Sequence, residues 1–170
     1  MAQLDQIQIT FIPNEDRLLL RLSTQSSEEF RFWLTRRLIK GLRPLITQSL
    51  AAQPRIQTQA TPEAKRELLK FEHEQVMQVA DFKTPYKAAE KQLPLGEHPI
   101  LITRIQVKRQ PGNIGLSLAP ATGQGIDLAL TPPLLHSFVA LLDHALAAAE
   151  WDLGQTLPLA TSASGPVSIN

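Results

Sequence analysis

Apolar and polar residues alternate with a period of two near the start of the chain, over residues 7–12 and 18–22. This is the period of half-buried strands, and the Pro-, Asn- and Asp-containing stretch between the two runs is typical of a tight turn. A polar stretch at residues 23–27 then leads into residues 28–46, where apolar side chains recur with helical spacing. The sequence therefore predicts an antiparallel hairpin followed by a helix that a serine of the polar stretch caps.

The same pattern closes the chain. Residues 114–118 and 126–130 alternate like the first two runs, and residues 132–150 are apolar with helical spacing. Thr131 precedes a proline there, and a capping hydroxyl followed by proline is a helix start signal. We therefore expect a second hairpin-plus-helix unit, and the two units bury their apolar faces by sharing one core.

Three further segments lie between these units. Thr61, again followed by proline, predicts a second helix that extends to about residue 81. Residues 83–99 contain several prolines and have no sustained period, so we expect a loop. Residues 100–108 are rich in β-branched side chains and predict a strand ahead of the closing hairpin.

The predicted order is ββα(α)βββα, which indicates an α+β fold with one antiparallel sheet of about five strands and helices packed on it. At 170 residues the chain has the length of one domain, which we place at residues 5–152. Residues 153–170 are rich in Gly, Ser, Thr and Pro, so we expect a flexible tail.

This order resembles that of longin-like and roadblock-like domains, in which a five-stranded antiparallel sheet covered by helices serves mainly as a docking platform. The resemblance covers most of the chain, rests on element order and implies a protein-binding role. A second resemblance is to the repeats of whirly or PUR-like folds, which bind single strands. Each repeat there has four strands before its helix, whereas the sequence predicts two and three, so we rank it lower.

The composition is that of an ordinary folded protein with little net charge. Hydrophobic residues make up 43% and charged residues 19%, and the formal net charge of +1 is well short of that of a dedicated nucleic-acid-binding domain. No stretch approaches the ~18 consecutive apolar residues of a membrane span, and the first residues lack the pattern of a signal peptide. We expect a soluble, cytoplasmic protein.

The sequence lacks the motifs that usually carry catalysis or cofactor binding. It contains no Cys and no P-loop, H-E-x-x-H or G-x-S-x-G motif. Gly123 and Gly125 form a G-x-G without the third glycine of a dinucleotide fingerprint. His136 and His144 do not have the i, i+4 spacing of a metal-binding pair. We therefore predict that the protein is not an enzyme and uses no cofactor or metal, and the sequence identifies no small-molecule substrate.

Four cations gather on the expected first helix. Arg36, Lys40 and Arg43 are spaced i, i+4, i+7, with Arg37 beside them and no acid among them. A run of like charge opposes helix stability, so it is a candidate surface for an acidic partner or for nucleic-acid phosphate. A solvated helix face is the simpler interpretation.

The last helix is the candidate surface for self-association. Its apolar residues point to almost all sides, which indicates that other elements or a second copy of the chain cover more than one face. The candidate residues are Leu134, Leu135, Phe138 and Leu142. The sequence therefore favours a non-enzymatic adaptor or assembly protein that binds a protein partner and self-associates. The alternative is an accessory nucleic-acid-binding protein that uses the cations of the first helix.

Overall fold

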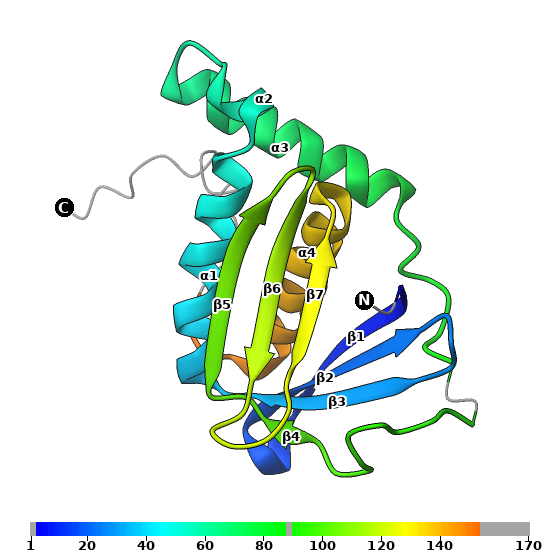
Figure 1. Ribbon diagram of the computed structural model, residues 1–170. Helices are drawn as coiled ribbons and strands as arrows, with labels where there is room; N and C mark the ends of the chain where they lie inside the picture. Colours follow the sequence, from blue (N-terminus) through cyan, green and yellow to red (C-terminus); the bar gives the residue numbers. More distant parts are fainter. Residues whose placement is uncertain (1–2, 88–89, 154–170) are drawn as a thin grey trace, which may run out of the picture.

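The chain forms two β-sheets, with helices packed between and around them. Our structure is a computed structural model that describes residues 3–87 and 90–153 (Figure 1). The strands are β1 (Leu4–Ile12), β2 (Arg17–Thr24), β3 (Glu29–Leu34), β4 (Ile100–Leu101), β5 (Arg104–Gln110), β6 (Asn113–Ala119) and β7 (Ile126–Leu130). The helices are α1 (Arg36–Ala51), α2 (Pro54–Gln57), α3 (Pro62–Val79) and α4 (Pro132–Ala149), and a 3-10 turn, η1 (Pro13–Glu15), joins β1 to β2.

The strand order is β1-β2-β3-β4 in the first sheet and β5-β6-β7 in the second. All pairs are antiparallel except β3 with β4, which is parallel. The α+β class is confirmed, whereas the prediction of a single five-stranded sheet is wrong. No helix in the described ranges is long and apolar enough to cross a membrane.

β3 is the main departure from the predicted elements. Residues 28–46 were expected to form one helix, but Glu29–Leu34 is a strand and α1 begins only at Arg36. Phe30 and Leu34 are four positions apart, and this spacing fits one face of a helix as well as alternate positions of a strand. The pairing across to β2 decides between them: Phe30, Phe32 and Leu34 lie opposite Leu22, Leu20 and Leu18.

The predicted N-cap of the first helix is wrong for the same reason, because the helix begins later than expected. Thr35 caps α1, and its Oγ1 accepts a hydrogen bond from the backbone N of Leu38 at 3.2 Å. The serines expected to cap the helix lie in the turn between β2 and β3, where Ser27 has a φ of 60°. The turn is stabilised by Thr24, whose Oγ1 accepts from the backbone N of Glu28 at 3.2 Å.

The run predicted as one strand at residues 100–108 is divided between the two sheets. Its first two residues form β4 beside β3, and its last five belong to β5. Between them, the backbone N of Ile102 donates to Trp33 O at 3.1 Å and that of Thr103 donates to Ala119 O at 3.0 Å. This crossing therefore connects the sheets directly.

The other predicted elements are confirmed. α3 and α4 begin where the capping signals placed them, because Thr61 Oγ1 accepts from Ala64 N at 3.1 Å and Thr131 Oγ1 accepts from Leu134 N at 3.4 Å. The hairpins β1–β2 and β6–β7 also form. Of the predicted tail at 153–170, only Leu153 lies within the described residues.

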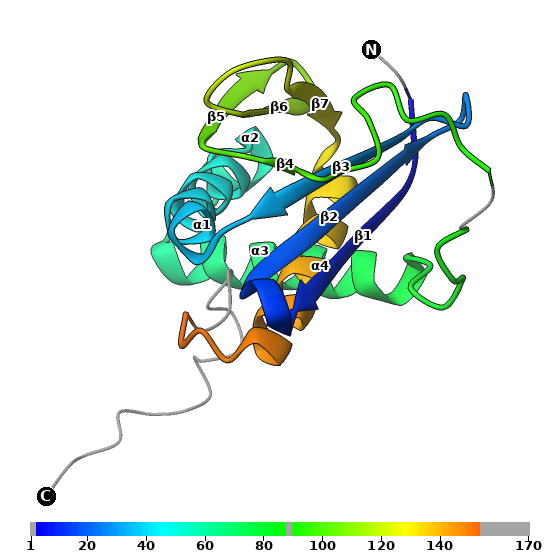
Figure 2. The ribbon, with the colours of Figure 1, turned by 90° about the horizontal axis from the view of Figure 1, so that it is seen from below.

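Each end of the chain is thus a three-stranded antiparallel unit followed by a long helix, and the helices are exchanged. α1 packs beside β5, and α4 packs beside β1 as well as against β6 and β7 of its own unit (Figures 1 and 2). The core joins both units: Leu20, Phe32, Leu116 and Phe138 are each 2% exposed or less. Neither unit therefore buries its apolar faces alone. The prediction of two strands before the first helix is wrong, since three precede α1, while β4 to β7 precede α4.

Candidate functional site

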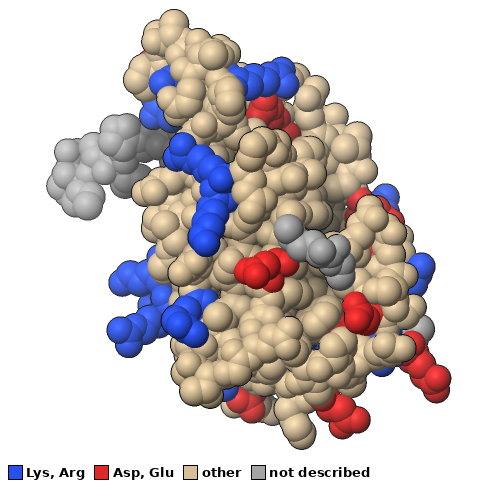
Figure 3. All heavy atoms as spheres, viewed as in Figure 1, with Lys and Arg blue, Asp and Glu red and all other residues tan. Residues whose placement is uncertain are grey.

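Lys and Arg side chains gather on one side of the molecule, over α1 and β5 (Figure 3). Arg36, Arg37 and Lys40 are exposed in the first turns of α1, and none of them forms an ion pair within the described part of the chain. The cations that β5 adds are likewise exposed: Arg104, Lys108 and Arg109. Because α1 and β5 pack side by side, the two sets form one basic surface.

Arg43, the fourth of the cations predicted to gather on the first helix, has a different environment. Its side chain is half-buried, and its Nη1 donates a hydrogen bond to the backbone carbonyl of Leu153. Arg43 therefore connects α1 to the residues that follow α4. The exposed cations of this set are Arg36, Arg37 and Lys40.

An apolar groove of about 470 Å³ lies next to these cations, between α1 and the crossing from β4 to β5. We call it the basic groove because Arg37 lines it and the other cations lie next to it. Its lining residues are Thr35, Arg37, Leu38, Gly41, Leu42, Leu45, Leu101, Ile102, Thr103 and Ile105. Leu45 on α1 and Leu101 on β4 are each 38% exposed, so both contribute uncovered apolar surface to the groove. Arg37 lines the groove as well, so the site offers a cation and an uncovered apolar surface together.

The four residues assigned to self-association lie in a different environment from the one expected. Leu135, Phe138 and Leu142 are buried within this chain, and only Leu134 of the four is partly exposed. The apolar circumference of α4 is covered by β1, α3, β6 and β7. These three side chains therefore present no surface to a second copy of the chain, and the apolarity of α4 is accounted for by its own fold.

Two histidines that the sequence analysis did not pair are in contact. The Nδ1 atoms of His73 on α3 and His136 on α4 lie 3.0 Å apart. Burial and, to a smaller extent, the charge of the neighbouring His73 together lower the pKa of His136 to about 4. Burial also lowers the pKa of His73, although the charges of Asp143 and Glu74 oppose this. Both rings are therefore neutral at pH 7. One Nδ1 is protonated and donates a hydrogen bond to the other.

A pocket of about 600 Å³ opens onto His136, between α3, the start of α4 and residues 53–55. Its walls include Val76, Val79, Pro132 and Pro133. The Nε2 atoms of His136 and Gln53 are buried, and neither has a hydrogen-bond partner within the described residues. Both residues line the pocket, which we call the histidine pocket.

A third cluster surrounds Glu29 on the outer face of the first sheet. The Glu29 carboxylate is buried and accepts hydrogen bonds from Arg31 Nε at 2.6 Å, Arg21 Nε at 3.2 Å and Tyr86 OH at 3.0 Å. Burial opposes its ionisation, but the bonds from Arg31 and Tyr86 and the charge of Arg21 prevail and lower the pKa of Glu29. Burial, together with the bond to Glu29 and its charge, raises the pKa of Tyr86 to about 12. The Glu29 carboxylate is thus paired with two arginines, and its bond to Tyr86 attaches the segment between α3 and β4 to the sheet.

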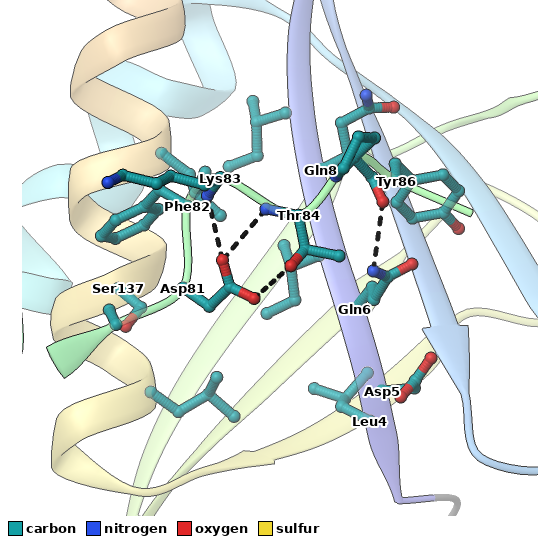
Figure 4. A pocket seen from close by; sticks show the side chains of 16 residues that line it. Leu4, Asp5, Gln6, Gln8, Asp81, Phe82, Lys83, Thr84, Tyr86 and Ser137 are labelled. Carbon is teal, nitrogen blue, oxygen red and sulfur yellow. Dashed lines mark hydrogen bonds between the residues drawn. The ribbon is translucent and has the colours of Figure 1, made fainter. Parts of the chain in front are cut away.

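The pocket in Figure 4, of about 640 Å³, lies between β1, residues 80–86 and α4. Two of its polar side chains, Asp81 and Gln6, bond to the backbone of the segment that connects α3 to β4. Asp81 Oδ1 accepts from the backbone N of Lys83 and of Thr84, each at 3.0 Å, and Gln6 Oε1 accepts from the backbone N of Lys87, also at 3.0 Å. Asp81 and Gln6 therefore support the path of this segment past β1.

Within the described ranges, no group of three or more His, Asp or Glu side chains is arranged to hold a metal ion. Comparison of the chain with protein-family models, with curated proteins and with solved structures found no match. The basic groove combines exposed charge with exposed apolar surface, whereas the Glu29 cluster has its charges paired. The sequence identified the cations of the groove but not its apolar wall, because Leu101 to Ile105 approach α1 only in the folded chain.

Proposed function

We propose that this chain is a non-enzymatic, cytoplasmic protein-binding module that holds an acidic segment of a partner protein in the basic groove. The observation that supports this is that Arg37 lines the same groove as the exposed Leu45 and Leu101. A partner segment with an apolar side chain beside Asp or Glu would cover the leucines and pair with the arginine. Burial of the apolar residue supplies affinity, while the charges on α1 and β5 supply orientation and a faster encounter.

The lining of the groove favours a protein over a nucleic acid. Among the described residues that line it, the apolar side chains are all aliphatic and none is aromatic. Proteins that hold single strands combine cations with aromatic rings on which bases stack. Aliphatic walls give phosphate nothing to bind, but they accommodate a leucine or valine of a protein partner.

Accessory nucleic-acid binding is the second candidate function. It is favoured by the exposed cations on α1 and β5 and by the count of three strands before α1, which comes nearer to the four-stranded repeats of whirly and PUR-like folds. Fold alone does not fix function. Each phosphate contact adds about 0.7–0.9 to the logarithmic salt slope, so the six exposed cations of α1 and β5 supply at most about 4–5, which is typical of weak, non-specific binding at physiological salt. We therefore expect weak or no binding of nucleic acid.

Site-directed photo-crosslinking in the cells that naturally make the protein tests the proposal. A photoreactive phenylalanine analogue at position 45 should crosslink to a protein, and the crosslinked peptide should carry Asp or Glu near an apolar residue. The control position is Phe71, which is 49% exposed on α3, away from the groove. The crosslink at position 45 should be lost with Arg37→Glu and Lys40→Glu together and kept with Arg66→Glu, a reversal of an exposed cation on α3. A position-45 crosslink that survives the double reversal would contradict the proposal.

Fluorescence anisotropy with single- and double-stranded oligonucleotides tests the second candidate. Submicromolar binding at about 150 mM salt, lost when Arg36, Arg37 and Lys40 are all changed to Glu, would rank nucleic-acid binding first. Weak binding that the triple reversal leaves unchanged would exclude this surface.

Self-association stays a prediction, now without Leu135, Phe138 and Leu142 as its surface. Light scattering at micromolar concentration measures it directly. A dimer mass would support an assembly role, and a monomer mass would leave a monomeric adaptor.

A further inference from the structure

The histidine pocket contains two polar atoms whose hydrogen bonds are unmade. His136 is 1% exposed, yet its Nε2 has no partner within the described residues, and the same holds for the buried Nε2 of Gln53. Leaving such atoms unsatisfied is costly, and native proteins usually pair them with protein, water or ligand. Both residues line the same pocket, so an occupant that reaches the two Nε2 atoms would satisfy both.

We propose that the histidine pocket binds a small apolar molecule that bears a carboxylate. The Nε2 of Gln53 can only donate, so the occupant must offer an acceptor there. The Nε2 of His136 donates when it carries a proton, and a carboxylate has a second oxygen to accept from it. An alcohol offers one oxygen and no charge, and it satisfies the pair less completely.

The contact with His73 allows His136 to hold an anion. In the neutral pair one proton lies between the two Nδ1 atoms, 3.0 Å apart. When the carboxylate enters, the pair takes up one proton from solution, so that His136 carries hydrogen on both nitrogens and donates to His73 and to the ligand. The negative ligand thus replaces the solvation that burial removes from the imidazolium.

The other charged groups around the histidine pair influence whether the pair takes up a proton. Glu72 and Arg55 line the pocket and form an ion pair at 3.4 Å, so they add little net charge. Asp143 on α4 and Glu74 on α3 act on His73 and favour its protonated form. Proton uptake by the pair therefore has support on the side away from the ligand.

The apolar part of the occupant would lie against Val76, Val79 and the two prolines that begin α4. Val79 is 84% exposed, and a ligand in the pocket would cover some of this surface. The pocket volume of about 600 Å³ is within the range of small-molecule sites. Within the described part of the chain the pocket shares no lining residue with the basic groove, so this inference does not depend on the proposed function.

Nuclear magnetic resonance of the full chain with ¹⁵N-labelled histidine tests the inference, with hexanoate and hexan-1-ol as matched probes. Hexanoate should bind at least about tenfold more tightly than the alcohol, a difference of about 1.4 kcal/mol. It should shift the imidazole nitrogens of His136 and His73 and leave those of His144, exposed on the same helix, unchanged. Its affinity should rise as the pH falls below the usual histidine pKa of about 6.5, because binding then takes up a proton that the free pair does not hold.

Two variants locate the site. Val79→Glu adds a negative charge at an exposed position of the pocket and should weaken hexanoate binding about tenfold without disturbing the core. His144→Gln is the matched control and should bind like the unaltered chain. Equal affinity for hexanoate and hexan-1-ol, affinity independent of pH, or no shift at His136 under saturating hexanoate would each overturn the inference. In those cases the pocket holds water or apolar groups only.

Discussion

His73 and His136 are 63 positions apart in the sequence, yet their Nδ1 atoms lie 3.0 Å from each other in the fold. The contact links α3 to α4, and α3 has few other anchors, since Leu69 is its only buried residue among those described. A neutral imidazole pair is therefore part of what holds α3 in place. Protonation of both rings would place two like charges in contact, so the contact depends on pH.

We expect the protein to lose stability as the pH falls from about 6.5 to about 4. In the unfolded chain His136 titrates near its ordinary pKa of 6.5, whereas burial lowers its pKa to about 4 in the folded protein. Between these values the unfolded state binds more protons, so the free energy of unfolding decreases with decreasing pH. The loss from His136 is about 3 kcal/mol at most.

Urea denaturation at a series of pH values measures this loss. His136→Gln should flatten the decline, because the residue that titrates is gone. The exposed His144 provides the control, and His144→Gln should leave the decline unchanged. A decline that is the same in all three proteins would assign the acid sensitivity to other groups.

The first turns of α1 give a second prediction. Helical spacing in the sequence predicts that Leu34, Leu38 and Leu42 are buried. The structure does bury Leu34 and Leu42, but it buries Ile39 as well and leaves Leu38 half-buried. Ile39→Ala should therefore lower the free energy of unfolding by about 2–5 kcal/mol, and Leu38→Ala should lower it by less. Urea midpoints of the two variants decide the order, and a larger loss for Leu38→Ala would favour the prediction from helical spacing.

The contact between Trp151 and Asp16 gives a third. Trp151 Nε1 donates to Asp16 Oδ1 at 2.8 Å, and its ring meets Phe11 edge-on with centroids 6.0 Å apart. Trp151→Phe keeps an aromatic ring but removes the donor, and we expect a loss of about 1 kcal/mol. Asp16 has a φ of 48°, so Asp16→Gly removes the acceptor without straining the backbone. In a double-mutant cycle the two changes should couple by about 0.5–1 kcal/mol, and strict additivity would show that the bond contributes nothing.

The sequence predicted best where the signal is local. Thr61 and Thr131, each followed by proline, placed the starts of α3 and α4 correctly because capping depends on neighbouring residues alone. It failed where tertiary pairing chooses between local alternatives. The i, i+4 spacing of Phe30 and Leu34 fits strand and helix equally, and only pairing with β2 makes it a strand.

The candidate sites divide in the same way. Arg36, Arg37 and Lys40 are neighbours on one helix, so their clustering is visible in the sequence. The apolar wall that completes the basic groove comes from residues 101–105, which no local pattern connects to α1. The contact of His73 with His136 likewise depends on how α3 crosses α4, because no spacing rule relates residues so far apart.

Gly125 and Gly41 give the last prediction, with effects of opposite sign. A Cβ at position 125 would lie 2.8 Å from the Cα of Ala119 and closer still to the carbonyl oxygen of Leu118, so β6 and the start of β7 would have to separate. Gly125→Ala should therefore destabilise the protein by about 1–3 kcal/mol, the usual cost of overpacking.

At position 41 a Cβ would meet nothing within 4 Å among the described residues, and Gly41 is inside α1. Gly41→Ala should thus raise the free energy of unfolding by about 0.5–1 kcal/mol, because alanine loses less conformational entropy in a helix. Thermal melts check both signs. Because Gly41 also lines the basic groove, a Gly41→Ala protein that is more stable but loses the crosslink at position 45 would show that the groove needs this open surface.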